Sequence, residues 1–149
     1  WLREDRVLYT GIGPDGKFVA ELPAAVPFDR ALLDRGRQRY DVFCSPCHGR
    51  QGNGEGMIVQ RGFKQPASFH VDRLRAQPLG YFFDVMTNGF NEMSSYASQV
   101  PAKDRWAIAA YVRALQLSRN APASELSPAD LEALEKAAAP AAAAPEVHP

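Results

Sequence analysis

Apolar residues in the middle of the chain recur at helical spacing, and polar loops separate the segments that carry them. The first such segment runs from 29 to 43, where Asp29 is a candidate cap. Its apolar and small residues share one helical face: Leu32, Leu33, Gly36, Tyr40 and Phe43. A second helix is expected in residues 78–89, because proline is favoured at a helix start and glycine just past its end.

The clearest pattern follows in residues 102–117, AKDRWAIAAYVRALQL. Its buried side would carry Trp106, Ala109, Ala110, Val112 and Leu115. The segments 49–72 and 90–102 are too polar and aperiodic for regular structure. No hairpin dipeptide joins alternating runs, so an all-α fold is predicted.

Three zones are expected along the chain. Residues 1–28 hold glycine, proline and scattered apolar residues without helical period, which predicts an irregular N-terminal extension with a turn at residues 14–16. Residues 29–118 would form the functional domain. Residues 119–149 form an alanine- and proline-rich extension with a short helix near 128–138, started by Ser127 and Pro128, and a flexible tail after Pro140.

Composition narrows the function. The formal net charge is zero, but residues 29–118 hold 12 basic and 8 acidic residues, while both ends are acidic. Such a mildly basic body is unlike a nucleic-acid binder, which gathers many more Lys and Arg on one face. No apolar run reaches the roughly 20 residues that span a bilayer. An export signal or lipid anchor, if used, is expected to precede Trp1.

Both cysteines lie in the stretch FCSPCHGRQGNGEGM, as Cys44 and Cys47, with His48 directly after the second. This cluster could hold zinc, cycle as a redox dithiol, or bind haem. A structural zinc site needs four ligands, and a second pair of ligands is missing. A redox Cys-x-x-Cys is expected at a helix start after a strand, whereas here a predicted helix precedes it. Haem accounts for all three residues: two thioether links and a proximal imidazole.

The second axial ligand must come from elsewhere in the chain. Met93 lies in the polar loop NGFNEMSSYA, after a glycine that ends a helix, where a core methionine is not expected. The rival donors are His70, His148, Met57 and Met86. Met86 falls in an apolar helix, where methionine usually packs in the core. We therefore expect Met93 opposite His48.

These segments resemble class I cytochrome c. GRQRYDVFCSPCHG is similar to the first helix and haem motif of that family, DRWAIAAYVRAL to its C-terminal helix, and TNGFNEMSSYA to its distal-ligand loop. The resemblance implies one covalent haem c, two helices that cross closely at Gly36, and one-electron transfer without substrate chemistry. It also implies a proline carbonyl that accepts a hydrogen bond from the proximal imidazole, for which Pro66 is the candidate.

A finer resemblance covers CHGRQGNGEGMIVQRGFKQPASFHVDRLR and the segment from Asn88 to Gln116. Both resemble the monohaem cytochrome c subunit of bacterial alternative complex III, a membrane quinol:electron-acceptor oxidoreductase. This implies multihaem, iron–sulfur and membrane subunits as partners, terminal extensions that wrap onto them, and a position on the periplasmic face, peripheral or lipid-anchored. The alternatives are a free or tethered electron carrier, and a haem sensor or enzyme with an open sixth site.

Overall fold

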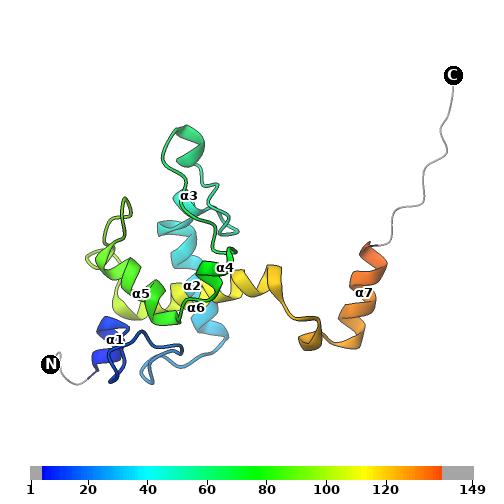
Figure 1. The fold of residues 1–149 in the computed structure, drawn as a ribbon, viewed down its shortest axis with the longest axis horizontal. Helices are drawn as coiled ribbons and strands as arrows, with labels where there is room; N and C mark the ends of the chain where they lie inside the picture. Colours follow the sequence, from blue (N-terminus) through cyan, green and yellow to red (C-terminus); the bar gives the residue numbers. More distant parts are fainter. Residues whose placement is uncertain (1–4, 139–149) are drawn as a thin grey trace. The chain divides into compact units, whose positions relative to one another are not determined.

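A computed structural model describes residues 5–138 of the chain, and Figure 1 shows their path. Its elements are α1 (Arg6–Thr10), α2 (Arg30–Phe43), α3 (Ser45–His48), η1 (Val59–Arg61), α4 (Asp72–Arg75), α5 (Leu79–Asn88), α6 (Ala102–Asn120), η2 (Ala123–Glu125) and α7 (Pro128–Ala138). In this part of the chain β pairing is limited to two isolated bridges, Ile12–Phe18 and Phe90–Met93. The predicted all-α class is confirmed.

Helices α2 and α5 begin and end within one residue of the predicted bounds, and α6 begins as predicted but continues three residues beyond 117. The Asp29 carboxylate accepts a hydrogen bond from the Leu32 amide at 2.7 Å and so caps α2. Pro78 precedes α5, and Gly89 follows it. Helix α6 is buried on all sides over residues 105–110, which include Trp106 and Ile108, and Val112 is buried as well.

Helices α2 and α6 approach each other most closely at Gly36. A Cβ built on Gly36 would lie 2.1 Å from the Ala107 carbonyl oxygen, so no larger side chain fits there. One turn later along α2, Tyr40 is fully buried and its ring lies 5.3 Å from that of Tyr111 on α6. The glycine therefore brings the α2 backbone against α6 and directs the end of α2 into the core.

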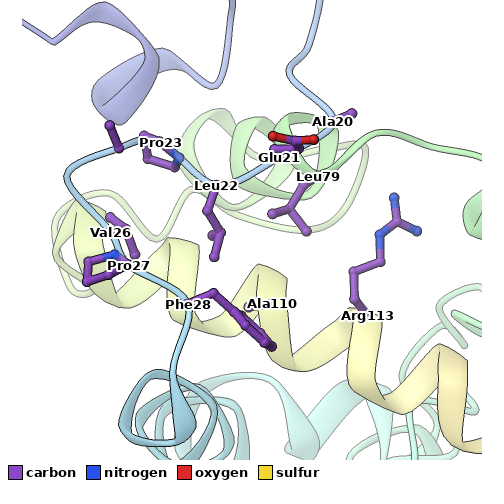
Figure 2. A pocket seen from close by; sticks show the side chains of 11 residues that line it. Ala20, Glu21, Leu22, Pro23, Val26, Pro27, Phe28, Leu79, Ala110 and Arg113 are labelled. Atoms are coloured by element: carbon purple, nitrogen blue, oxygen red, sulfur yellow. The ribbon is translucent and has the colours of Figure 1, made fainter.

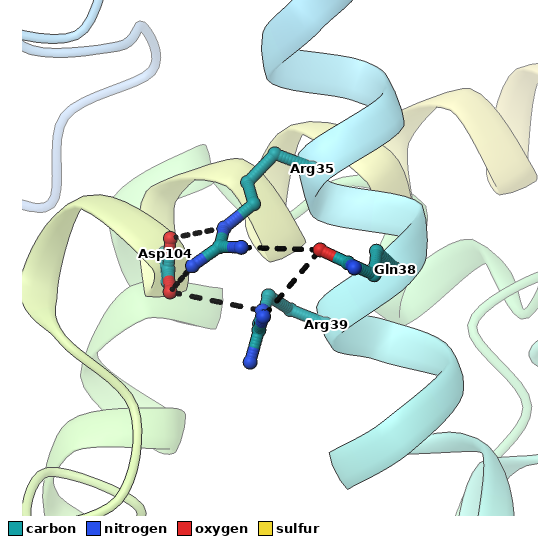
Figure 3. A network of polar contacts seen from close by, with 4 residues as sticks. All are labelled: Arg35, Gln38, Arg39 and Asp104. Carbon is teal, nitrogen blue, oxygen red and sulfur yellow. Dashed lines mark hydrogen bonds and ion pairs between the residues drawn. The ribbon is translucent and has the colours of Figure 1, made fainter.

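A polar cluster at one side of this contact links the same two helices (Figure 3). Asp104 of α6 accepts two hydrogen bonds from the Arg35 guanidinium, each 2.8 Å long, and lies 3.9 Å from Arg39 Nε. Gln38 accepts a further hydrogen bond from Arg35 at 3.1 Å. The bidentate geometry helps to fix the rotation of α6 against α2. It adds little to the free energy of folding, because the Arg35 side chain is 45% exposed to solvent.

The N-terminal residues are more ordered than predicted. Residues 6–10 form helix α1, whose start is capped by Asp5 through a 2.9 Å hydrogen bond from the Leu8 amide. Leu8 is buried, and its carbonyl accepts a 2.8 Å hydrogen bond from the Trp106 indole. The expectation of an irregular extension over 1–28 was wrong for this helix, because one capped turn is too short to show helical period.

Residues 11–28 continue along the same core. The predicted turn at 14–16 is present, and the Val19 carbonyl accepts a hydrogen bond from the Gly80 amide at 2.8 Å. Val26 is 4% exposed. The chain up to Arg119 forms one compact unit, so no boundary between units falls at 28/29.

The haem-motif loop also holds more regular structure than its composition predicts. Within 49–72, residues 59–61 form the 3-10 turn η1, and α4 begins at Asp72. Each element is only one turn long, and hydrogen bonds to distant residues support the segments around them. Hydropathy periodicity cannot detect elements of this length.

The described residues from Asn120 to 138 belong to a second compact unit. Within its described part, α7 lies where Ser127 and Pro128 predict a helix, and Ser127 Oγ accepts a hydrogen bond from the Asp130 amide at 3.2 Å. The tail expected after Pro140, with His148, lies outside the described residues.

Replacement of Gly36 by alanine tests the close helix contact. We expect Gly36→Ala to lower the free energy of unfolding by about 3 kcal/mol, the upper end of the range for overpacked cores, because a backbone carbonyl must move. Denaturant unfolding followed by circular dichroism measures this. Arg37→Ala, at the exposed next position of α2, should change the value by less than about 0.5 kcal/mol. Equal stability of the two variants would contradict the close contact.

Candidate functional site

The end of α2 leads directly into the cysteine–histidine motif. Cys44 closes α2, since its amide donates to the Tyr40 carbonyl at 2.9 Å, and it also precedes α3. Pro46 occupies the first turn of α3, where its missing N–H costs nothing. The His48 amide then donates to the Cys44 carbonyl at 2.9 Å. The sequence thus places two thiols and an imidazole on one tight helical turn.

The glycine-rich loop folds back over this turn. The amides of Gly54, Gly56 and Ile58 donate to the carbonyls of His48, Cys47 and Pro46 at 2.8, 3.1 and 3.1 Å. A Cβ on Gly56 would lie 2.1 Å from the Pro46 carbonyl oxygen, which explains why this position needs glycine. The carbonyls of the motif are therefore satisfied within the chain, and its geometry is fixed from both sides.

A second anchor reaches the motif from α2. The buried Tyr40 hydroxyl donates to the Gly49 carbonyl at 2.7 Å, directly after His48. Burial raises the pKa of Tyr40, so the hydroxyl stays protonated and can donate. Tyr40 thus couples the α2–α6 contact to the position of the imidazole.

His48 lies in an apolar setting. Its ring stacks on Phe69, with centroids 4.7 Å apart and planes 14° apart. Burial lowers the pKa of His48 to about 4, so the ring is neutral at pH 7 and has a nitrogen lone pair available for a metal. Its Nδ1 atom is buried and finds no hydrogen-bond partner in residues 5–138. Such an atom calls for an acceptor or an additional group at this site.

The two thiols do not have the properties of a redox dithiol. Burial raises the pKa of Cys44 to about 12 and also raises that of Cys47, whereas reactive Cys-x-x-Cys pairs have a lowered pKa. No strand precedes them in the part of the chain that the structure describes. Within that part, no group of three His, Cys, Asp or Glu side chains could hold a metal ion.

Cys44 and Met93 share the wall of one small cavity. Its volume is about 10 Å³, and its lining consists of Phe43, Cys44, Met86, Met93, Tyr96, Val100, Arg105 and Ile108. The wall is apolar except for the sulfur atoms, the tyrosine and the arginine. Met86 is a second thioether here, which sequence reasoning had assigned to the core. Its burial in α5 is as expected, but helical period alone could not show that this face meets Met93.

The loop that carries Met93 is held at both ends. Met93 and Phe90 exchange two backbone hydrogen bonds of 2.9 Å, and the Tyr96 amide donates to the Met86 carbonyl at 2.9 Å. Glu92 pairs with Lys64 of the motif loop at 2.7 Å. This exposed ion pair adds little free energy, but it joins the two loops on either side of the site.

Two of the rival ligands, His70 and Met57, lie elsewhere, whereas Met86 shares the cavity with Met93 and His148 is outside the described residues. His70 Nε2 is 2.7 Å from the Gln51 carbonyl oxygen, with which it shares a hydrogen bond, and Met57 is 52% exposed. Neither lines the cavity of Met93. The Pro66 carbonyl oxygen lies close to Gly54, where a built Cβ would be 2.3 Å away, and no hydrogen bond joins it to His48 among the described residues. The structure thus brings Pro66 near the motif without the expected bond.

A larger groove on the same unit is chemically different. It has a volume of about 480 Å³ and lies between residues 20–28 and helices α5 and α6 (Figure 2). Its wall includes Leu22, Phe28, Leu79 and Arg113. The groove offers no thiol, thioether or imidazole, so it lacks the donors that the haem site requires. The larger of these two cavities is therefore not the candidate haem site.

Comparison with known proteins gives the family. A family model described as cytochrome c oxidase, cbb3-type, subunit III matches residues 31–112, more than half of the chain. The chain belongs to this cytochrome c family. Members of this family bind haem c, and the function of such a domain is electron transfer.

Comparison with solved structures supports the fold and nothing more specific. This cytochrome is similar to a chain of the Kuenenia stuttgartiensis reducing HAO-like protein complex Kustc0457/Kustc0458, with a TM-score of 0.52 and 23% sequence identity. The match covers 64% of the cytochrome and 49% of the other chain, so our chain matches only about half of that protein. No curated protein matches.

The residues present fit a covalently bound haem. Two thiols at the required spacing, a neutral imidazole and thioethers in an apolar cavity would supply the donors that a c-type cytochrome needs, and the buried His48 Nδ1 is left for an acceptor within the protein. When bound, the haem supplies a one-electron Fe(III)/Fe(II) couple. Within residues 5–138, no helix combines the length and apolar character needed to cross a bilayer.

Loss of the Tyr40 hydroxyl should weaken the cytochrome. In Tyr40→Phe the Gly49 carbonyl loses its buried donor, so we expect the free energy of unfolding to fall by about 1–2 kcal/mol. Guanidinium unfolding of the haem-loaded protein measures this. Tyr81→Phe is the matched control, since no hydrogen bond of the Tyr81 hydroxyl occurs among the described residues. A loss as large in the control would show that removal of a tyrosine hydroxyl lowers stability without any hydrogen bond, and would contradict the role of the Tyr40–Gly49 bond.

Proposed function

We propose that this protein is a monohaem electron-transfer cytochrome in which Cys44 and Cys47 hold the haem and His48 and Met93 bind its iron. One observation carries the proposal: an attachment thiol at the end of α2 and the loop methionine line the same apolar cavity. His48 follows the second thiol on the adjoining turn. The two axial donors would then come from helix α3 and from the loop of Met93, and the Lys64–Glu92 pair joins that loop to the one that follows α3.

The choice between the two thioethers rests on the segments that carry them. Met86 lies inside α5, is 7% exposed, and packs in the core next to Phe82 and Phe83. Met93 lies in a turn that two backbone hydrogen bonds with Phe90 hold in place, so its side chain is not needed to fix the loop. A thioether on such a loop is free to serve as a ligand without loss of helix packing.

Pro66 is proposed as the acceptor for His48 Nδ1. The imidazole nitrogen is buried without a partner, and the Pro66 carbonyl lies against Gly54, whose amide in turn donates to the His48 carbonyl. A hydrogen bond between them would fix the ring orientation and raise the basicity of the ligand nitrogen.

The surrounding residues act by positioning and by excluding water. Phe43, Ile108 and Tyr96 give the site an apolar wall, and a low-dielectric wall disfavours the additional positive charge of the ferric state. Methionine opposite histidine acts in the same direction. One electron enters and one leaves, and no side chain has to transfer a proton or form a bond with a substrate.

We further propose that the cytochrome is a subunit of a membrane quinol:electron-acceptor oxidoreductase of the alternative complex III type, on the extracytoplasmic side. Support comes from the resemblance of the segments around His48 and Met93 to that subunit. Cytochrome c domains are typically extracytoplasmic. Its partners would be multihaem, iron–sulfur and membrane subunits, and a downstream electron acceptor.

Matched methionine variants test the iron ligand. Met93→Leu should lose the low-spin, six-coordinate spectrum and the red charge-transfer band of methionine ligation, while Met86→Leu should keep both. Leucine conserves the volume at each position, so packing losses stay below about 1.5 kcal/mol. Visible absorption and a pyridine haemochrome assay on each protein measure ligation and covalent attachment. The opposite pattern would assign the ligand to Met86, and an unchanged spectrum in both variants would reject a thioether ligand.

Co-purification tests the assembly. After mild detergent extraction of membranes, an affinity tag on the full-length cytochrome should recover a stable set of haem-stained and iron–sulfur subunits that oxidises quinol. Recovery of the cytochrome alone after extraction without detergent would instead identify a diffusing carrier. Recovery alone only after detergent treatment would identify a tethered one.

A matched control separates assembly from haem loss. Met93→Leu should still co-purify with the partners, since the variant is expected to keep its covalent haem and surface. Failure of both the native protein and this variant to bring down partners would contradict the subunit role and leave the haem assignment unaffected.

A further inference from the structure

Arg105 is a buried charge that the site described so far does not use. Its residue exposure is 6%, although arginine is rarely buried without an ionic partner. Its Nε and Nη1 atoms are buried and have no hydrogen-bond partner in residues 5–138. The ion pairs in that part of the chain involve other arginines and Lys64, and none involves Arg105. A buried guanidinium without compensation destabilises the fold, so its presence needs a reason.

The neighbouring acid does not neutralise it. Asp104 precedes Arg105 on α6, but its carboxylate points to α2, where it binds Arg35 and lies near Arg39 (Figure 3). Successive residues of an α-helix point about 100° apart, so Asp104 and Arg105 serve different surfaces. The Asp104 carboxylate is therefore engaged by Arg35 and forms no ion pair with Arg105.

An aromatic ring supports the guanidinium instead. The Arg105 Cζ atom lies 4.9 Å from the centroid of Phe83, whose ring also stacks on Trp106 at 4.5 Å. A cation over an aromatic face gains attraction without losing its charge. Phe83 thus fixes the guanidinium in place but leaves the positive charge uncompensated.

Arg105 belongs to the wall of the candidate haem site, because it lines the same cavity as Cys44 and Met93. In haem, the two vinyl groups that react with cysteine lie on the edge opposite the two propionates. A cation in the wall that Cys44 also lines would therefore be nearer to the thioether edge than to the propionates that could neutralise it.

We propose that Arg105 is a positioning residue for charge: its buried guanidinium raises the reduction potential of the haem by disfavouring the ferric form. The proposal rests on the haem site assigned above. Reduction adds one electron, supplied by a donor protein or an electrode, and lowers the charge at the iron by one unit. A fixed cation nearby favours that change. For unit charges about 10 Å apart at an effective dielectric constant of about 20, Coulomb's law gives an effect on the order of tenfold in the equilibrium constant.

Neutral and charge-conserving variants test this in the haem-loaded, full-length protein. Spectroelectrochemical titration of Arg105→Met should show the ferric form favoured about tenfold more than in the native protein, which is about 59 mV for a one-electron couple. Arg105→Lys, which keeps the charge, should stay within about threefold of the native value. Arg30→Gln removes the same charge from a side chain that is 86% exposed, and it should leave the potential unchanged because solvent screens it.

Several outcomes would overturn the proposal. An unchanged potential in Arg105→Met, or an equal shift in Arg105→Lys, would show that only packing on Phe83 matters. A shift that appears only above or below one pH value would indicate a propionate partner, because its titration would then become visible. Arg105→Gln provides a second neutral variant. If both neutral variants fail to incorporate haem while Arg105→Lys succeeds, the charge builds the site and does not tune it.

The same samples keep this proposal separate from the site assignment. A pyridine haemochrome assay reports covalent attachment, and the visible spectrum reports the axial ligands. Loss of either signal in the native protein would count against the assigned haem site. An unshifted potential in a fully loaded variant with native ligation would count against the role of Arg105 alone.

Discussion

The close approach of α2 and α6 at Gly36 is the constraint on which the rest of the site depends. Because no Cβ separates the two backbones, α2 can lie directly against the Ala107 carbonyl and carry Tyr40 into the core. Tyr40 then binds the carbonyl that follows His48. The absence of a side chain at Gly36 thus sets the distance between α2 and α6. That distance in turn sets the position of the two thiols and the imidazole that follow the end of α2.

Helix α6 divides its chemistry between two surfaces. Asp104 fixes its rotation against α2, and the next residue turns a positive charge toward the cavity of Cys44 and Met93. The loops complete the arrangement from the other side, where backbone hydrogen bonds hold both the cysteine–histidine turn and the methionine turn. Rigid helices therefore place one half of the site, and loops that are tied by their own backbones place the other half.

Sequence reasoning reaches furthest where a residue acts through its immediate neighbours. Helices α2, α5 and α6 were predicted because their apolar faces repeat at helical period, and Cys44, Cys47 and His48 could be proposed as haem residues because their chemistry depends on spacing alone. That Met86 and Arg105 line the cavity of Met93 could not be predicted, because it depends on which faces of α5 and α6 meet across the core. Helix α1 was missed for a third reason: a single turn shows no period, and only its cap at Asp5 marks it.

The N-terminal contacts show that the family match and the hydrophobic core begin at different places in the chain. The family match starts at residue 31, yet Leu8 and Val26 belong to the hydrophobic core, and the Trp106 indole finds its acceptor at Leu8. Residues 31–112 thus contain every proposed haem contact but not every wall of the core. The family match therefore marks the segment that holds the haem chemistry. The segment that must fold together begins at least 20 residues earlier, at Leu8.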